Sequence, residues 1–237
     1  MAARVTEIWR YGEIDVMYER HLEGAGRAVT PPLLDFVRSF CGDQHFSSAL
    51  DCFAGVGFIG LGLVAEGLCD SITLADIDAK AIDYARQNIV LNKLEGRAHA
   101  YVSDNFAAFP RDARFDVVVA NPPWYWQVDR SHPLFPLLKS KLDVVSEDSG
   151  WRIHQAFYRD VGAFLNPGAL LFVLEGDPNR PEVVLCGQAF DKRPAAPASL
   201  FHEMMRQGGL EPVSDHHIWS DPFGGEVWAQ VSRKALR

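Results

Sequence analysis

The sequence contains no stretch that could act as a secretory signal or cross a membrane as a helix. Its first residues, MAARVTEIWRYGEIDV, carry a charge every few positions and have no apolar core of the signal-peptide kind. No run approaches the roughly 18 consecutive apolar residues that a spanning helix needs. We therefore expect a cytoplasmic protein that has no membrane contact.

Cysteine is scarce and is not arranged for metal binding. The four cysteines show neither a C-x-x-C pair nor a Cys/His spacing of the zinc-binding type. This argues against both a structural metal and a disulfide framework. We expect reduced cysteines and no metal site.

Positive charge is also in short supply. Lys and Arg total 23 against 31 Asp and Glu, so the formal net charge is −8. Proteins that bind nucleic acid through its phosphates usually present a basic surface. Nucleic acid is therefore disfavoured as a partner, and a small molecule or a protein is favoured.

The chain alternates apolar strand-like runs with helix-like segments after about residue 30. Strands are expected at 47–55, 71–78, 97–105, 114–123 and 168–176, with two more within 211–236 joined by a Gly-Gly turn. Helices are expected at 30–40, 58–68, 79–94, 153–165 and 199–209, the first one capped by Thr30. The pattern predicts a Rossmann-like, doubly wound α/β fold, whose mostly parallel seven-stranded sheet ends in an antiparallel hairpin.

We expect one main domain. Residues 1–30 would form an N-terminal arm or lid, and residues 31–237 the domain itself. Two long loops, 125–150 and 177–197, are expected to set the substrate together with the N-terminal arm, because long loops at the functional end of a sheet often set specificity. The histidines, including His154, His216 and His217, are assigned surface or core roles.

A glycine-rich turn follows the first strand of the sheet. Gly55, Gly57 and Gly60 match G-x-G-x-x-G between a strand and a helix, a pattern shared by nicotinamide, flavin and S-adenosylmethionine (SAM) folds. Asp51, just before this turn, would crowd a pyrophosphate but suits the cationic amino acid end of SAM, directly or through water. The alternative for Asp51 is a turn or cap residue.

Acidic residues also follow the next two strands. Asp76 can accept hydrogen bonds from both ribose hydroxyls of a nucleoside, with Asp78 as an alternative that could instead cap the following helix. Asp104 can accept from an adenine amine while Asn105 meets the ring, although Ser-Asp-Asn is also ordinary turn chemistry. Phe53, Ile77 and Thr30 complete the expected cofactor contacts.

The fourth strand ends in Asn121, Pro122, Pro123 and Trp124. The prolines have no N–H and cannot extend the strand ladder, so the Asn121 side-chain oxygen and the Pro122 carbonyl can point into the site. Both could accept from one planar NH2 group and orient its nitrogen toward the methyl group of SAM. Trp124, Tyr125 and Trp126 are expected to contact the substrate.

At these motifs the chain resembles the class I SAM-dependent N-methyltransferases with Asn-Pro-Pro-aromatic, most of all the release-factor glutamine and small-domain methyltransferases. The resemblance covers about residues 28–176. It implies SAM binding at Asp51, Gly55, Gly57, Asp76, Asp104 and Asn121, and acceptor orientation by Asn121, Pro122, Pro123 and Trp124. Only about 30 residues precede the domain and Trp replaces the commoner Tyr, so a release-factor glutamine is not assumed.

The expected function is methyl transfer from SAM to a planar amide, amine or guanidine nitrogen of a small molecule or a protein side chain. The alternative is methylation of an exocyclic amine of an RNA or DNA base. An NAD-dependent oxidoreductase would leave Asp51 and the Asn-Pro-Pro motif without roles, and a silent SAM-binding subunit would not need that motif.

Overall fold

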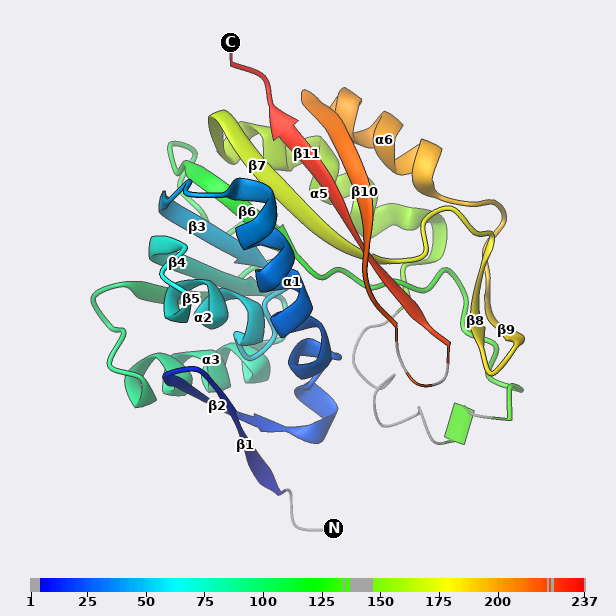
Figure 1. Ribbon diagram of the computed structural model, residues 1–237, viewed down its shortest axis with the longest axis horizontal. Coiled ribbons are helices and arrows are strands. Elements are labelled where there is room, and N and C mark those ends of the chain that lie inside the picture. The colour runs from blue at the N-terminus through cyan, green and yellow to red at the C-terminus, as the bar shows by residue number, and fades with distance from the viewer. Residues whose placement is uncertain (1–4, 134, 137–146, 221, 223, 237) are drawn as a thin grey trace.

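The computed structural model describes residues 5–133, 135–136, 147–220, 222 and 224–236. At its centre is a seven-stranded sheet in the order β10-β11-β7-β6-β3-β4-β5 (Figure 1). β11 runs antiparallel to both β7 and β10, whereas the other neighbours pair in parallel. The strands are β3 (Phe46–Cys52), β4 (Cys69–Asp76), β5 (Ala98–Val102), β6 (Phe115–Ala120), β7 (Leu165–Gly176), β10 (Leu210–Ser220) and β11 (Glu226–Lys234). The predicted fold class and its terminal antiparallel hairpin are confirmed.

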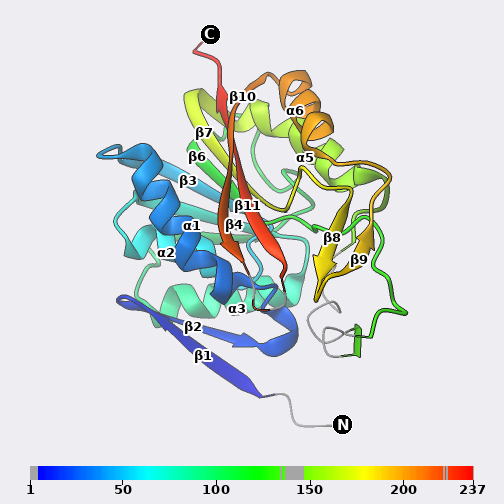
Figure 2. The same ribbon diagram turned by 45° about the vertical axis from the view of Figure 1, so that its right-hand side comes forward.

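Helices cover both faces of this sheet (Figures 1 and 2). Successive side chains of a strand point to opposite faces of the sheet, and in β6 they are apolar on both faces. Val117 and Val119 belong to one buried cluster and Val118 to the other. The first cluster includes residues of α1 (Gly26–Cys41), α2 (Phe58–Ala65) and α3 (Ala79–Leu91). The second includes residues of α5 (Arg152–Val161) and α6 (Ala198–Gln207).

Parallel pairing brings the carboxyl ends of the central strands to one edge. Cys52 lies opposite both Ala75 and Ala120, and Asp76 lies opposite Val102. The loops that follow these strands, which carry the predicted site motifs, therefore meet at this edge.

The predicted cap of the first helix is wrong. α1 begins at Gly26, one turn earlier than expected, and the residue at its N-cap position is Ala25. Thr30 lies inside the helix, where its hydroxyl donates to the Gly26 carbonyl at 2.6 Å. The two prolines that suggested a helix start sit within α1 instead. Helix α1 thus crosses the expected boundary at residue 30.

An N-terminal hairpin was not predicted. β1 (Thr6–Tyr11) pairs antiparallel with β2 (Ile14–Glu19) and forms a two-stranded sheet of its own. α3 holds it with side-chain amides, since Asn88 bonds both the N–H and the carbonyl of Met17, and Asn92 does the same for Asp15. The remaining described short elements are 3-10 turns at Arg20–Leu22, Ser149–Trp151 and Gly162–Phe164.

The expected loop 177–197 contains a second hairpin, β8 (Glu182–Leu185) with β9 (Gln188–Lys192). Its buried ion pair, Arg193 with Asp191 at 3.0 Å, binds the chain after the Asn-Pro-Pro motif. Arg193 donates to the Trp124 carbonyl at 3.1 Å, and Asp191 accepts from the Trp126 and Gln127 N–H groups. The expected loop 125–150 lies partly outside the described residues.

His154 of α5 has the core role expected of it, but in a charged form that the sequence did not indicate. It is fully buried between Asp148 and Glu175, each 2.7 Å from one ring nitrogen. Burial lowers the pKa of His154, but the charge of Glu175 and the bonds to both carboxylates outweigh it and raise the pKa to about 9. Asp148, which follows the undescribed residues 137–146, is thus tied to the end of β7.

No helix in the described part of the chain is both long enough and apolar enough to span a membrane.

The packing of α2 on the sheet gives a first prediction. A Cβ added at Gly60 would collide with the Leu74 side chain and lie 2.9 Å from the Asp51 Cβ. We expect Gly60→Ala to lower the free energy of unfolding by about 1–3 kcal/mol in urea denaturation, although alanine favours a helix. Gly96→Ala, where no atom lies within 4 Å of the added carbon, is the control and should have little effect. Equal stability of the two variants would contradict this packing.

The charged histidine predicts a specific pH dependence. The substitution His154→Gln leaves two buried carboxylates without a cation. It should lower the free energy of unfolding by about 3–5 kcal/mol at pH 7. The folded pKa, about 9, lies above the ordinary value of 6.5, so this stabilisation is complete below pH 6.5 and lost as the pH rises through 9. Urea unfolding should show a smaller deficit at pH 10 than at pH 7, with the exposed His216→Gln as control. A deficit that does not change with pH would contradict a protonated His154.

Candidate functional site

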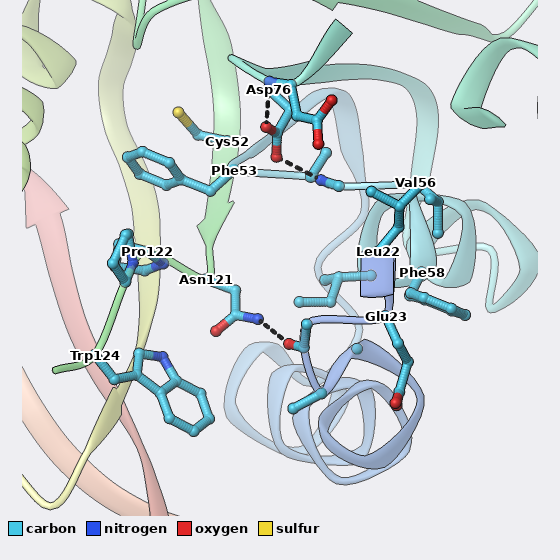
Figure 3. A pocket seen from close by; sticks show the side chains of 18 of the residues that line it. Leu22, Glu23, Cys52, Phe53, Val56, Phe58, Asp76, Asn121, Pro122 and Trp124 are labelled. Carbon is cyan, nitrogen blue, oxygen red and sulfur yellow. Dashed lines mark hydrogen bonds between the residues drawn. The ribbon is translucent and has the colours of Figure 1, made fainter. Parts of the chain in front are cut away.

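A cavity of about 730 Å³ opens at the edge where β3, β4, β5 and β6 end (Figure 3). Its walls come from the loops after these strands, the stretch that leads into α1, and the end of the β10–β11 hairpin. In Figure 3, Asp76 lies at one end and Trp124 at the other, with Asn121 and Pro122 between them. The four loops that carry the predicted motifs therefore share one cavity.

The glycine turn forms part of the cavity wall. Gly55 and Gly57 have positive φ of 54° and 96°, which glycine adopts without the steric penalty of a Cβ. Phe53 also has a positive φ of 64°. Phe53 and Gly55 line the cavity, whereas Gly57 does not and packs toward Leu74 and Leu61 at the start of α2.

Asp51 lies beneath this turn and is not among the lining residues. It is fully buried, and one of its oxygens accepts from the Gly60 N–H at 2.7 Å. Burial raises the pKa of Asp51 to about 8, against the lowering effect of that bond. The second oxygen has no hydrogen-bond partner among the described residues, so it can form a hydrogen bond with a bound water or ligand.

Asp76 lines the cavity with its carboxylate oriented by the backbone. Its oxygens accept from the N–H groups of Gly55 at 2.8 Å and Asp78 at 2.9 Å. A carboxylate can accept about four hydrogen bonds, so both oxygens retain capacity for ribose hydroxyls. Burial raises the pKa of Asp76. Asp78 caps α3 by accepting from Lys80 and Ala81, which is the structural role given as its alternative.

The residues expected to contact the adenine also border the cavity. Asp104 and Asn105 line it together with Ser103, and the exposed Ile77 lies on the same side. The Asn105 side-chain oxygen is buried and has no partner in the part of the chain that is described. Thr30 does not line the cavity, because its side chain is buried between α1 and Gly62 of α2.

Asn121 carries an unused acceptor. Its amide nitrogen donates to the Gly24 carbonyl at 3.4 Å, while its buried side-chain oxygen has no partner among the described residues. Gly24 precedes α1, so the N-terminal stretch orients this side chain (Figure 3). Pro122, Pro123, Trp124 and Tyr125 continue the wall.

Trp126 points away from the cavity. It packs into the cluster under α5 and α6, with its ring centroid 5.6 Å from that of Trp151. Of the three consecutive rings, Trp124 and Tyr125 are therefore available to a substrate in the cavity and Trp126 is not among its lining residues.

Two parts of the wall contain residues that the sequence did not single out, although residues 1–30 were expected to form an arm or lid. The stretch that contains Glu23, Gly24 and Ala25 has no strand-end motif, and only its contact with Asn121 reveals a role. The other part, Trp219 and Glu226, flanks the Gly-Gly turn that was used only to predict a hairpin.

Comparison with known proteins finds a family match and curated relatives. Residues 36–135 match the family described as "Methyltransferase small domain". A release factor glutamine methyltransferase of Fusobacterium nucleatum is 33% identical over 136 residues, which are 57% of this chain and 37% of that protein. A ribosomal RNA large subunit methyltransferase G of Shewanella amazonensis is 28% identical over 131 residues, 55% of this chain and 29% of that protein.

Solved structures show the same fold. The structure of TYW2 from P. horikoshii in complex with MeSAdo has a TM-score of 0.61 at 16% identity and covers 100% of this chain and 74% of that one. The match to the two curated relatives spans about a third of their lengths, 37% and 29%. Residues 36–135 of the chain thus match the methyltransferase small domain family, and the fold is that of the class I methyltransferases.

Proposed function

We propose that this protein transfers the methyl group of SAM to a planar NH2 nitrogen, an amide, amine or guanidine nitrogen of a small molecule or a protein side chain. One observation carries the proposal: the buried Asn121 oxygen lies in the same cavity as Asp76 and the glycine turn and has no partner among the described residues. A buried acceptor without a donor costs free energy, and a substrate NH2 group would supply that donor.

The residues of the cavity divide into two groups in this proposal. Asp76 would bind the ribose, Asp104 and Asn105 the adenine, and Asp51 the amino acid end through a water molecule. Asn121 and the Pro122 carbonyl would accept the two hydrogens of the acceptor NH2, and Trp124 or Tyr125 would stack on its plane. SAM, when bound, supplies a methyl group on a sulfonium, a good leaving group, so orientation of the nitrogen is the main task of the protein.

We further propose that three segments set the choice of acceptor: residues 1–30, the loop 125–150 and the loop 177–197. Two contacts support this. The stretch before α1 bonds Asn121 through Gly24, and Arg193 holds the Trp124 carbonyl.

A base amine in RNA is a second candidate acceptor, because one of the relatives is named a ribosomal RNA methyltransferase. A transfer assay with labelled SAM over protein, RNA and small-metabolite fractions distinguishes the candidates. Label on carbon or oxygen, instead of nitrogen, would refute methyl transfer to nitrogen.

Replacing Asn121 tests whether its side chain orients the acceptor nitrogen. Asn121→Ala should keep SAM affinity within about threefold of the wild type but lower turnover at least about a hundredfold, as loss of an orienting contact in the transition state does. Calorimetry measures the affinity, and the transfer assay measures turnover. Asn179→Ala, at an exposed position, is the matched control. Unchanged turnover in Asn121→Ala would remove Asn121 from the mechanism.

The raised pKa of Asp51 predicts that a proton is released when the cofactor binds. Its pKa is about 8, so the carboxyl is largely protonated at pH 7. A nearby ammonium group favours the ionised form, so SAM binding should expel this proton. Calorimetry at pH 7 in two buffers with different heats of ionisation should give different binding enthalpies, and Asp51→Asn should abolish the difference. The same difference in Asp51→Asn would show that the proton comes from another group.

A further inference from the structure

The cavity wall carries negative charge and no positive charge among its described residues. Its ionisable side chains include five carboxylates, and none of the described lining residues is Lys, Arg or His. The carboxylates are Glu23, Asp76, Asp78, Asp104 and Glu226. A phosphate-bearing acceptor would meet unfavourable electrostatics here, and a cationic acceptor would meet favourable ones.

Most of these carboxylates have other roles. Glu23 pairs with Arg27 at 3.2 Å. Asp76 and Asp78 accept from backbone N–H groups, and Asp104 lies with Asn105 at the proposed adenine end. Glu226 is the one of these five carboxylates to which no other role has been assigned.

Glu226 lines the cavity near the chain that carries Trp124, because Gly176 is close both to the Glu226 backbone and to Arg193, which donates to the Trp124 carbonyl. It begins β11, where the next residue, Val227, pairs with Gly176 at the end of β7. Among the described residues, Glu226 forms no ion pair, and its one side-chain hydrogen bond is from the Trp228 indole N–H at 3.4 Å. One carboxylate oxygen is therefore free of described donors.

Aromatic rings are also present in the cavity wall. Trp124, Tyr125 and Trp219 line the same cavity as Glu226. Rings and a carboxylate together are the usual means of binding an organic cation, because the ring faces and the carboxylate both attract positive charge.

From these two features we propose that the methyl acceptor is a guanidinium group, recognised by Glu226 and the surrounding rings. The inference rests on the proposed function. Asn121 and Pro122 require a planar NH2 group, which an ammonium lacks. The acidic, ring-lined wall favours a cation, which an amide or a neutral base is not. A guanidinium meets both requirements.

The bonds, protons and charges of the proposed methyl transfer can be accounted for with the described residues. An acceptor nitrogen forms a bond to the methyl carbon, and the carbon–sulfur bond breaks with its electron pair left on sulfur. Another nitrogen of the guanidinium gives up one proton to the Glu226 carboxylate, which is partly exposed and returns it to water, while Asn121 and Pro122 keep the two hydrogens of the acceptor NH2. The acceptor keeps its single positive charge, and the positive charge of SAM leaves as the released proton.

Binding of a matched pair of probes tests the charge requirement. L-arginine amide and L-citrulline amide have the same shape, but the second carries a neutral urea. With S-adenosylhomocysteine present, tryptophan fluorescence should show at least about tenfold tighter binding of L-arginine amide, and Glu226→Gln should remove most of that preference. Equal affinities for the two probes, or binding of neither, would overturn the proposal.

A control variant separates local recognition from overall charge. Glu211→Gln makes the same change at an exposed position of β10 outside the cavity wall and should keep the wild-type preference. Both variants should bind S-adenosylhomocysteine like the wild type. An equal loss of preference in both variants would refute a specific role for Glu226.

The transfer assay distinguishes failure of this inference from failure of the proposed function. Label on a guanidino nitrogen, in either the protein or the small-metabolite fraction, supports the inference and identifies its source. Label on a glutamine amide or a base amine would overturn the guanidinium inference but leave methyl transfer to nitrogen intact. Absence of SAM binding would refute the proposed function itself.

Discussion

Parallel hydrogen bonding between β3 and its two neighbours is the constraint on which the rest of the site depends. It places the ends of β4 and β6 at the level of Cys52, so that loops far apart in sequence surround one cavity. The glycine turn leads into α2, where the Gly60 N–H lies close enough to the buried Asp51 to donate to its carboxyl group. Cofactor and acceptor ends of the cavity are thereby held by the same sheet.

The acceptor side depends on a second, more local set of bonds. Pro122 and Pro123 cannot continue the strand ladder, so the chain beyond them needs other partners. The buried Arg193–Asp191 pair supplies them by bonding the backbone of residues 124, 126 and 127. A buried ion pair is costly to desolvate, but its geometry is specific. Here it holds the backbone so that Trp124 and Tyr125 line the cavity and Trp126 does not.

The sheet and the glycine turn were predictable because strand patterning, helix spacing and turn glycines are local signals. The start of α1 was not, because Pro31 and Pro32 mimic a first helical turn while the helix begins at Gly26. The N-terminal hairpin was hidden for a different reason: the amides of Asn88 and Asn92 hold it, and such contacts leave no periodic pattern. The roles of Glu226 and Arg193 could not be predicted either, because the Trp124 carbonyl that Arg193 bonds and most of the cavity that Glu226 lines lie far away in sequence.

The chain leaves and rejoins the acceptor wall at nearly the same place. Tyr125 bridges to Glu147, and the N–H of Asp148 donates to the Tyr125 carbonyl at 2.7 Å. These two points are fixed to each other, and Gln127 and Val128 are held as well, by bonds to Asp191 and Glu147. A change between Tyr125 and Glu147 that spares these held residues can therefore alter the mouth of the pocket without moving Asn121.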